Sequence, residues 1–139
     1  MIVDITVAKQ ILKTAKAILL IDWPSPDVPR ALVDAGFTVY GYSPNRYSVA
    51  ELVDDGTGTK KMIFRKLDDH PGSVDIVNVF RPEEELEGIV KEHVLPLGAK
   101  TLWLHPPVAS AWARSYAGQN HLAFVEGIDI AEIAGTLAV

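Results

Sequence analysis

The chain has 139 residues, a length typical of one domain that buries its own apolar core without disulfides or metal. Its residues are 48% hydrophobic and 22% charged, which excludes a largely disordered chain. The formal net charge of -5 argues against nucleic acid as a partner, because nucleic-acid binding needs clustered lysine and arginine.

Cysteine is absent, so disulfides, thiolate metal sites and cysteine nucleophiles are excluded. The four histidines are spread along the chain without metal-ligand spacing, and we therefore expect no metal site. No apolar run is long enough to span a bilayer, and Asp4 lies where a signal peptide carries basic residues. We expect a cytoplasmic protein with no membrane partner, folded as a single domain over residues 1–139.

The first elements alternate between helix and strand. Apolar residues at spacings of three and four predict an amphipathic helix over residues 4–16. Residues 17–21 form a continuous apolar run, which is typical of a strand buried on both faces of a parallel sheet. Asp27 is expected to cap a helix over residues 28–35, and Gly36 to end it.

The segment after the second predicted strand, residues 37–42, has a weaker pattern. Residues 48–53 are consistent with one or two helical turns, and residues 61–64 with a short edge strand. The glycines of the turn at residues 55–58 indicate a hairpin-like connection rather than a phosphate loop, because no helix follows them.

From residue 74 the alternation of strands and helices returns. Strands are expected at residues 74–80, 101–104 and 122–126, and helices at 82–94, 108–117 and 129–137. Alternating β and α elements imply right-handed βαβ units with helices on both faces of the sheet. The sequence therefore predicts an α/β fold, a Rossmann-like three-layer sandwich with a mostly parallel five-stranded sheet.

The turn after the first predicted strand contains no glycine. In α/β chains this turn normally holds phosphates, since glycines let backbone N–H groups approach the anion. Here Asp22 and Trp23 are followed by Pro24 and Ser25. Two interpretations remain open: Asp22 accepts hydrogen bonds from a ribose hydroxyl or other neutral group while Trp23 stacks on a base, or Asp22 caps the turn and Trp23 fills the crevice.

A second group of candidate residues follows the second predicted strand, where Rossmann-type proteins place residues that contact a ribose or its phosphate. Ser43, Pro44 and Asn45 precede Arg46, which would supply the positive charge that the first loop lacks. The alternative is a solvated turn.

The ends of two later strands carry three further candidates. Arg81 is suited to bidentate phosphate contact, and its alternative role is an ion pair with Glu84 or Glu85. Phe80 forms either an apolar wall for an adenine or part of the core. His105 has a pKa suited to proton transfer, but no nucleophile is visibly paired with it, so we assign no catalytic residue and expect a binding protein rather than an enzyme.

Four stretches of the chain, residues 11–18, 32–39, 74–84 and 98–104, follow the order and spacing of a known family. With them the chain resembles the small stand-alone CoA-binding-domain proteins, which are related to the CoA-binding domain of succinyl-CoA synthetase. The strand that ends in Phe80-Arg81-Pro82-Glu83 is the most specific of these motifs. The resemblance implies a Rossmann-type fold that binds CoA or a similar nucleotide, usually without catalytic activity.

Three departures from the family pattern fall at the carboxyl ends of strands. The loop at Asp22 is shorter than in the family and lacks its glycine, His105-Pro106-Pro107 stands in place of Gln-x-Gly, and no cysteine follows the fifth predicted strand.

The sequence and the resemblance together predict non-catalytic binding of CoA, acyl-CoA or a similar nucleotide-like molecule at the carboxyl ends of the strands. The candidate cofactor-binding residues are Asp22, Trp23, Pro24, Ser25, Ser43, Pro44, Asn45, Arg46, Phe80, Arg81 and His105. The alternative is a family member with a closed site that acts as a protein-interaction or homodimerisation module. Its interface would use aromatic residues expected to be exposed, namely Trp23, Tyr42, Tyr47, Trp112 and Tyr116.

Overall fold

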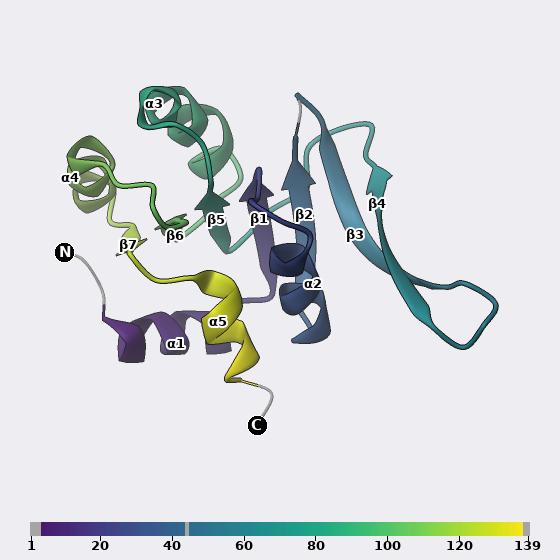
Figure 1. The fold of residues 1–139 in the computed structure, drawn as a ribbon. Coiled ribbons are helices and arrows are strands. Elements are labelled where there is room, and N and C mark those ends of the chain that lie inside the picture. The colour runs from purple at the N-terminus through teal and green to yellow at the C-terminus, as the bar shows by residue number, and fades with distance from the viewer. Residues whose placement is uncertain (1–3, 44, 138–139) are drawn as a thin grey trace.

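A seven-stranded sheet forms the centre of the computed structural model, which describes residues 4–43 and 45–137 (Figure 1). The strand order is β4-β3-β2-β1-β5-β6-β7. The five strands β2, β1, β5, β6 and β7 are parallel, whereas β3 is antiparallel to both β2 and β4. The strands are β1 (Ala17–Ile21), β2 (Thr38–Tyr42), β3 (Tyr47–Asp54), β4 (Lys60–Lys66), β5 (Ile76–Val79), β6 (Thr101–Leu104) and β7 (Ala123–Glu126).

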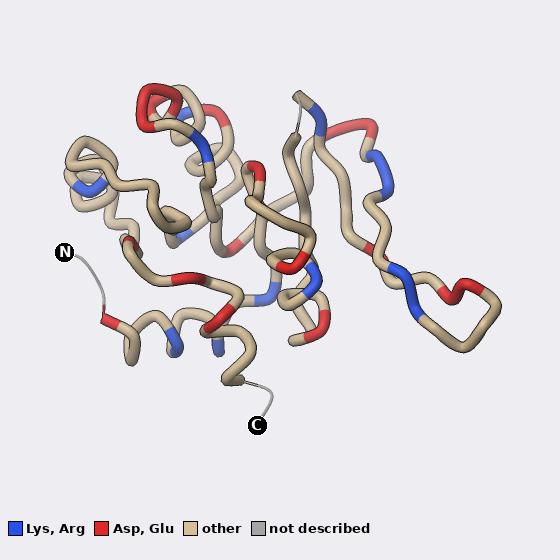
Figure 2. Tube along the Cα trace, viewed as in Figure 1, with Lys and Arg blue, Asp and Glu red and all other residues tan. Residues whose placement is uncertain are grey.

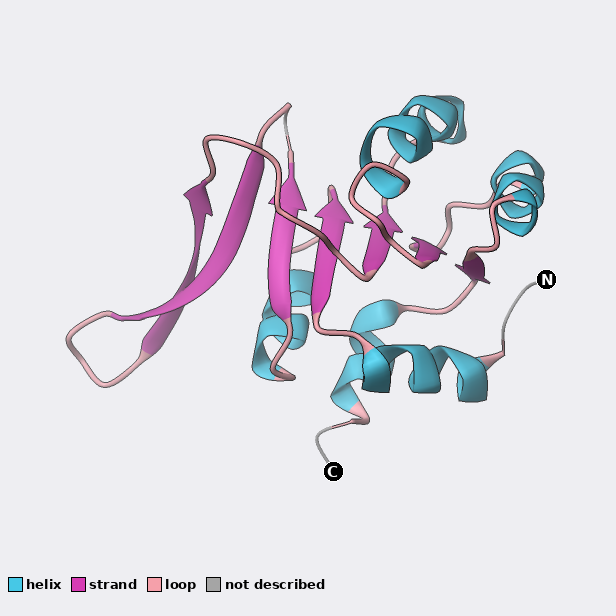
Figure 3. Ribbon diagram, turned by 180° about the vertical axis from the view of Figure 1, so that it is seen from behind, coloured by secondary structure: helices cyan, strands magenta, loops and turns pink. Residues whose placement is uncertain are grey.

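Helices cover both faces of the parallel part of the sheet (Figures 1 and 3). One face packs against α1 (Ile5–Thr14), α2 (Asp27–Asp34) and α5 (Ile130–Gly135). The other face packs against the segment formed by η1 (Glu83–Glu85), α3 (Leu86–Ile89) and η2 (Val90–Val94), and against α4 (Ala111–Gln119). The predicted three-layer, Rossmann-like α/β sandwich is therefore confirmed.

The central strands are buried on both faces, as their apolar sequences predict. Within β1, Ile18 and Leu20 join the core under α1, α2 and α5, while Leu19 and Ile21 join the core under α3 and α4. This alternation follows from the period of two residues in a strand.

The predicted strand count of five is corrected to seven, because a hairpin of β3 and β4 extends the sheet beyond β2 (Figure 1). The expected edge strand at residues 61–64 is present within β4, but the helical turns expected at residues 48–53 are wrong, since these residues lie in β3. Antiparallel pairing with β4 places Ala50 opposite Phe64 and Leu52 opposite Met62. This long-range pairing outweighs the weak local preference of the segment.

Capping side chains set several helix boundaries. Asp4 accepts a hydrogen bond from the backbone N–H of Val7 and begins α1, and Asp129 caps α5 in the same way. The helix expected from residue 108 begins instead at Ala111, because Ser110 is its N-cap. Asp27 is the first residue of α2 rather than the expected cap, so its carboxylate lies in the first turn.

The strand order brings two loops together at one edge of the sheet. β1 lies in the middle of the sheet. β2 is added on one side of it and β5, later in the chain, on the other side, so β1 and β5 flank the topological switch point. The backbone N–H of Phe80 donates to the carbonyl of Ile21 at 3.0 Å, which fixes the loop after β5 beside the loop after β1. Among the described residues no helix is both long and apolar enough to cross a membrane.

Candidate functional site

The carboxylate of Asp22 is held in place at the tip of β1. The residue has a φ of 62°, in the left-handed region that non-glycine residues rarely adopt. Its own N–H donates to the carbonyl of Tyr42 at 3.2 Å, and its Oδ1 accepts from the N–H of Trp23 at 2.9 Å and from Ser43 Oγ at 3.5 Å. The loop that lacks glycine therefore presents a fixed carboxylate at the switch point.

Arg81 is bound by two carboxylates. Its Nη1 donates to Asp22 Oδ2 at 3.0 Å, while Nε and Nη2 donate to the two carboxylate oxygens of Glu85 at 3.1 and 2.7 Å. The hydrogen bonds to Glu85 raise the pKa of the Arg81 guanidinium most, and the hydrogen bond to Asp22 raises it further. The ion pair with Glu85, one of the two roles that the sequence left open, is present, and contact with a ligand stays a prediction.

The largest of the cavities around this ion pair lies between the loops after β1, β5 and β6 and has a volume of about 560 Å³. We call it the switch-point cavity. Its apolar lining comes from Phe80, Pro82, Pro107, Val108 and Ala109, and its charged lining from Asp22, Arg81 and Glu83.

A second cavity of about 290 Å³ lies on the other side of the ion pair, toward α3, and we call it the helix-side cavity. It is lined by Ile21, Asp22, Tyr42, Ser43, Asn45, Arg81, Glu85 and Ile89. Asp22 and Arg81 line both cavities, so their ion pair lies at the boundary between the two.

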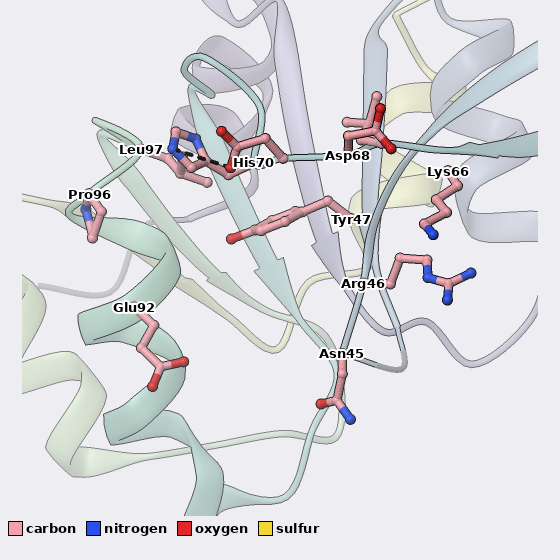
Figure 4. A pocket seen from close by; sticks show the side chains of 11 residues that line it. Asn45, Arg46, Tyr47, Lys66, Asp68, His70, Glu92, Pro96 and Leu97 are labelled. Carbon is pink, nitrogen blue, oxygen red and sulfur yellow. Dashed lines mark hydrogen bonds and ion pairs between the residues drawn. The ribbon is translucent and has the colours of Figure 1, made fainter.

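A third cavity of about 410 Å³, the hairpin cavity, is lined by one more of the predicted residues, Arg46, and shares Asn45 with the helix-side cavity (Figure 4). Tyr47 lies in the middle of this cavity, with Arg46 and Lys66 on one side of it and Glu92 on the other. The lining carries both signs of charge, and its members are Asn45, Arg46, Tyr47, Lys66, Leu67, Asp68, Asp69, His70, Glu92, Pro96 and Leu97.

Behind this cavity an aromatic cluster joins the hairpin to η2. The Tyr47 hydroxyl is hydrogen-bonded to His93 Nδ1, and the Tyr42 ring lies 4.3 Å from the His93 ring. Burial raises the pKa of Tyr47 to about 12 and lowers the pKa of His93. Burial therefore favours the neutral form of the His93 imidazole over the charged form.

Trp23 lies under the first loop rather than beside the cavities. Its ring stacks on Phe64 at 4.8 Å, and a Cβ at position 41 would lie 2.9 Å from it, so only glycine leaves it room. Ser25 Oγ accepts from the backbone N–H of Asp27 at 3.3 Å at the start of α2. Trp23, Pro24 and Ser25 are absent from the linings of these three cavities, and Pro44 lies outside the described residues.

His105 is buried next to the switch-point cavity and packs edge-to-face against Phe80, which lines it, with ring centroids 5.6 Å apart. Burial lowers the pKa of His105, and the charge of Asp129 opposes this shift. Two residues before Phe80, Asn78 is also buried. Within the described part of the chain, His105 Nδ1 and both polar side-chain atoms of Asn78 have no hydrogen-bond partner.

Sequence reasoning missed part of the switch-point cavity. Pro107, Val108 and Ala109 line it because the chain turns after β6, where the N–H of Val108 donates to the carbonyl of His105 at 2.9 Å, before Ser110 caps α4. The Pro106-Pro107 pair was the available signal, since prolines at a strand end mark a loop at the edge where ligands bind.

A family model described as a CoA binding domain matches residues 21–129, which include every loop around the switch-point cavity. The chain belongs to the CoA binding domain family. The resemblance found in the sequence is thereby confirmed.

Among proteins similar to this member of the CoA binding domain family is the uncharacterized protein YneT of Bacillus subtilis. It is 33% identical over 101 residues, which cover 68% of this chain and 67% of YneT.

Solved structures share the fold of this CoA binding domain. PH1109 protein redesigned for binding has a TM-score of 0.73 at 20% identity, with 98% of this chain and 93% of that chain covered. A Thermus thermophilus protein has a TM-score of 0.67 at 20% identity, covering 97% and 99% of the two chains. A conserved hypothetical protein from Pyrococcus furiosus has a TM-score of 0.57 at 23% identity, covering 84% and 97%.

Proposed function

We propose that this protein binds CoA, acyl-CoA or a similar nucleotide-like molecule at the carboxyl ends of β1 and β5, without catalysing a reaction on it. The observation that carries the proposal is the switch-point cavity of about 560 Å³ in a member of the CoA binding domain family. Open α/β sheets bind their ligands at this edge, and small-molecule sites have volumes of roughly 300–1,000 Å³.

The lining of the site suits the apolar arm of such a ligand better than its pyrophosphate. Phe80, Val108 and Ala109 offer an apolar wall for a pantetheine arm or an acyl chain. At the tip of β1, however, a carboxylate stands where phosphate-binding loops place glycines. Ser43, Asn45 and Arg46 along the tip of β2 would contact the polar, nucleotide end of the ligand.

Titration calorimetry with CoA, acetyl-CoA, NAD and ADP tests the proposal, with thermal shift as a second readout. We expect saturable binding of CoA or acetyl-CoA, and an affinity about tenfold lower in Phe80→Ala because the apolar wall is lost. Phe37→Ala is the matched control, since Phe37 precedes β2 at the opposite edge of the sheet. Absence of binding at millimolar concentrations of all four ligands would contradict the proposal.

A second candidate function, self-association through α4, is favoured by one exposed tryptophan that stacks on the half-buried Tyr116. Trp112 is 37% exposed and its ring stacks on Tyr116 at 4.9 Å. The other expected interface aromatics are half-buried: Trp23 packs on Phe64, and Tyr42 and Tyr47 pack around His93. Light scattering would show a dimer that Trp112→Ala weakens, and a monomer at all concentrations would remove this candidate.

A further inference from the structure

The ion pair of Asp22 and Arg81 separates two cavities that are each lined by two carboxylates and one guanidinium. Glu83 lines the switch-point cavity and Glu85 the helix-side cavity, in addition to the shared pair. The start of the η1–α3 segment is also acidic (Figure 2). A ligand phosphate entering either cavity therefore meets more negative than positive charge.

Each of the three guanidinium nitrogens of Arg81 donates a hydrogen bond to a carboxylate. Its Nε and Nη2 are used by Glu85, and Nη1, the nitrogen directed toward the tip of β1, is used by Asp22. A phosphate that approaches from the tip of β1 therefore competes with the Asp22 carboxylate for Nη1.

Asp22 is positioned for this role by the residues beneath it. Trp23 donates its backbone N–H to the Asp22 carboxylate, and the Trp23 ring is fixed between Phe64 and the backbone at Gly41. The carboxylate therefore reaches Arg81 from a loop that is anchored on the opposite face of the sheet from α3.

Resting on the function proposed above, we propose that Asp22 is the specificity-determining residue of the site. Its carboxylate acts as an internal anion that occupies Arg81 and keeps the two cavities apart. The site thereby selects ligands that place an uncharged, apolar arm in the switch-point cavity, and it rejects ligands that place a phosphate at the tips of β1 and β5.

The decisive variant is Asp22→Asn, with inorganic pyrophosphate and pantetheine as the probes in titration calorimetry. Asparagine tolerates the left-handed backbone at this position and keeps the size of the side chain while removing its charge. We expect the affinity for pyrophosphate to rise about tenfold, because a charge-assisted contact to Arg81 becomes available. The affinity for pantetheine, which carries no phosphate, should change less than twofold.

Two further variants separate this effect from others. Asp27→Asn makes the same charge change on α2, where Asp27 is absent from the contacts and cavities of Arg81, so it should leave pyrophosphate affinity unchanged. The double variant Asp22→Asn/Arg81→Gln should not show the rise in pyrophosphate affinity that is expected for Asp22→Asn alone. Asp22→Gly, which also suits the positive φ, repeats the test if the asparagine variant melts at a lower temperature.

The results distinguish the inference from the function on which it rests. Equal pyrophosphate affinity in the wild type, Asp22→Asn and Asp22→Gly, or an equal gain in Asp27→Asn, overturns the role of Asp22 even if the wild type binds CoA. A gain in pyrophosphate affinity that is confined to the Asp22 variants supports that role. If the wild type binds no CoA in the same experiments, the proposed function is contradicted but the role of Asp22 is not.

Discussion

At the scale of single residues, Asn78 is the most unusual side chain in the sheet. It is fully buried in β5, and its amide nitrogen and oxygen have no hydrogen-bond partner within residues 4–43 and 45–137. An unpaired polar group in a protein interior costs about 1–3 kcal/mol of stability. The position therefore works against the stability of the fold.

We predict that Asn78→Val increases the free energy of unfolding by about 1–3 kcal/mol, because the unpaired amide is replaced by a side chain that suits a buried strand. Urea denaturation measures the change. Ser110→Ala is the contrasting control, since Ser110 Oγ accepts from the N–H of Ala113 and caps α4, so its loss should destabilise by about 1 kcal/mol. A less stable Asn78→Val would contradict this account.

Sequence reasoning brought Asp22 and Arg81 to the same edge of the sheet but did not predict that they form an ion pair. Asp22 and Arg81 were placed at neighbouring strand ends because parallel strands end at the same edge of a sheet. Their ion pair joins residues 59 apart in the chain and depends on the positive φ of Asp22, which no local pattern encodes. The position of Trp23 likewise depends on the missing Cβ of Gly41 on the next strand.

At the scale of elements, the β3–β4 hairpin is the part that sequence patterns described least well. Its residues in β3 are all half-buried apart from Asp54, so they lack the clean alternation of a strand with one buried face. The pairing that defines it comes from β4, where Arg65 Nε also donates to Glu51 at 2.8 Å. Strand pairing of this kind follows from contacts distant in sequence, which explains why the helical expectation failed there.

We predict that Gly41→Ala lowers the free energy of unfolding by about 1–3 kcal/mol, since its Cβ would lie 2.9 Å from Trp23 and 3.1 Å from Phe64. Urea denaturation again gives the value. Gly88→Ala is the matched control, because Gly88 lies in α3 with nothing from the described residues within 4 Å of its added Cβ, and alanine there should be neutral or stabilising. Equal stability of Gly41→Ala and the wild type would show that the hairpin and first loop are not tightly packed.

At the scale of the whole molecule, the sequence predicted the layers because β1, β5, β6 and β7 are largely apolar and each is followed by a helical segment. The same pattern places the expected ligand at the carboxyl ends of the strands, and this binding position stays a prediction. The sequence did not predict how deeply some polar residues are buried. His93 in η2 and His105 after the end of β6 are both nearly inaccessible to solvent, although histidines in a sequence give no sign of burial.

These two histidines make the stability of the molecule sensitive to pH. Burial lowers the pKa of His93, against the opposing charge of Glu92, and lowers that of His105, against the opposing charge of Asp129. Their contribution to stability is therefore complete above about pH 6.5, the ordinary histidine pKa, because both histidines are then neutral in the folded and in the unfolded chain. Below it the unfolded chain binds protons that the folded chain does not, so stability falls toward acid.

We predict that the free energy of unfolding decreases between pH 7 and pH 5.5 with a slope of at most about 1.4 kcal/mol per pH unit for each histidine. His93→Asn/His105→Asn should flatten the slope, whereas His121→Asn, at an exposed position with a positive φ, should preserve it.

At the alkaline end, Tyr47 has a pKa of about 12, raised from 10.0, so stability should fall again as pH rises between these values. Tyr47→Phe should remove that alkaline loss, and urea denaturation across the pH range measures both limbs. An unchanged acidic slope in the double histidine variant would assign the loss to carboxylates instead.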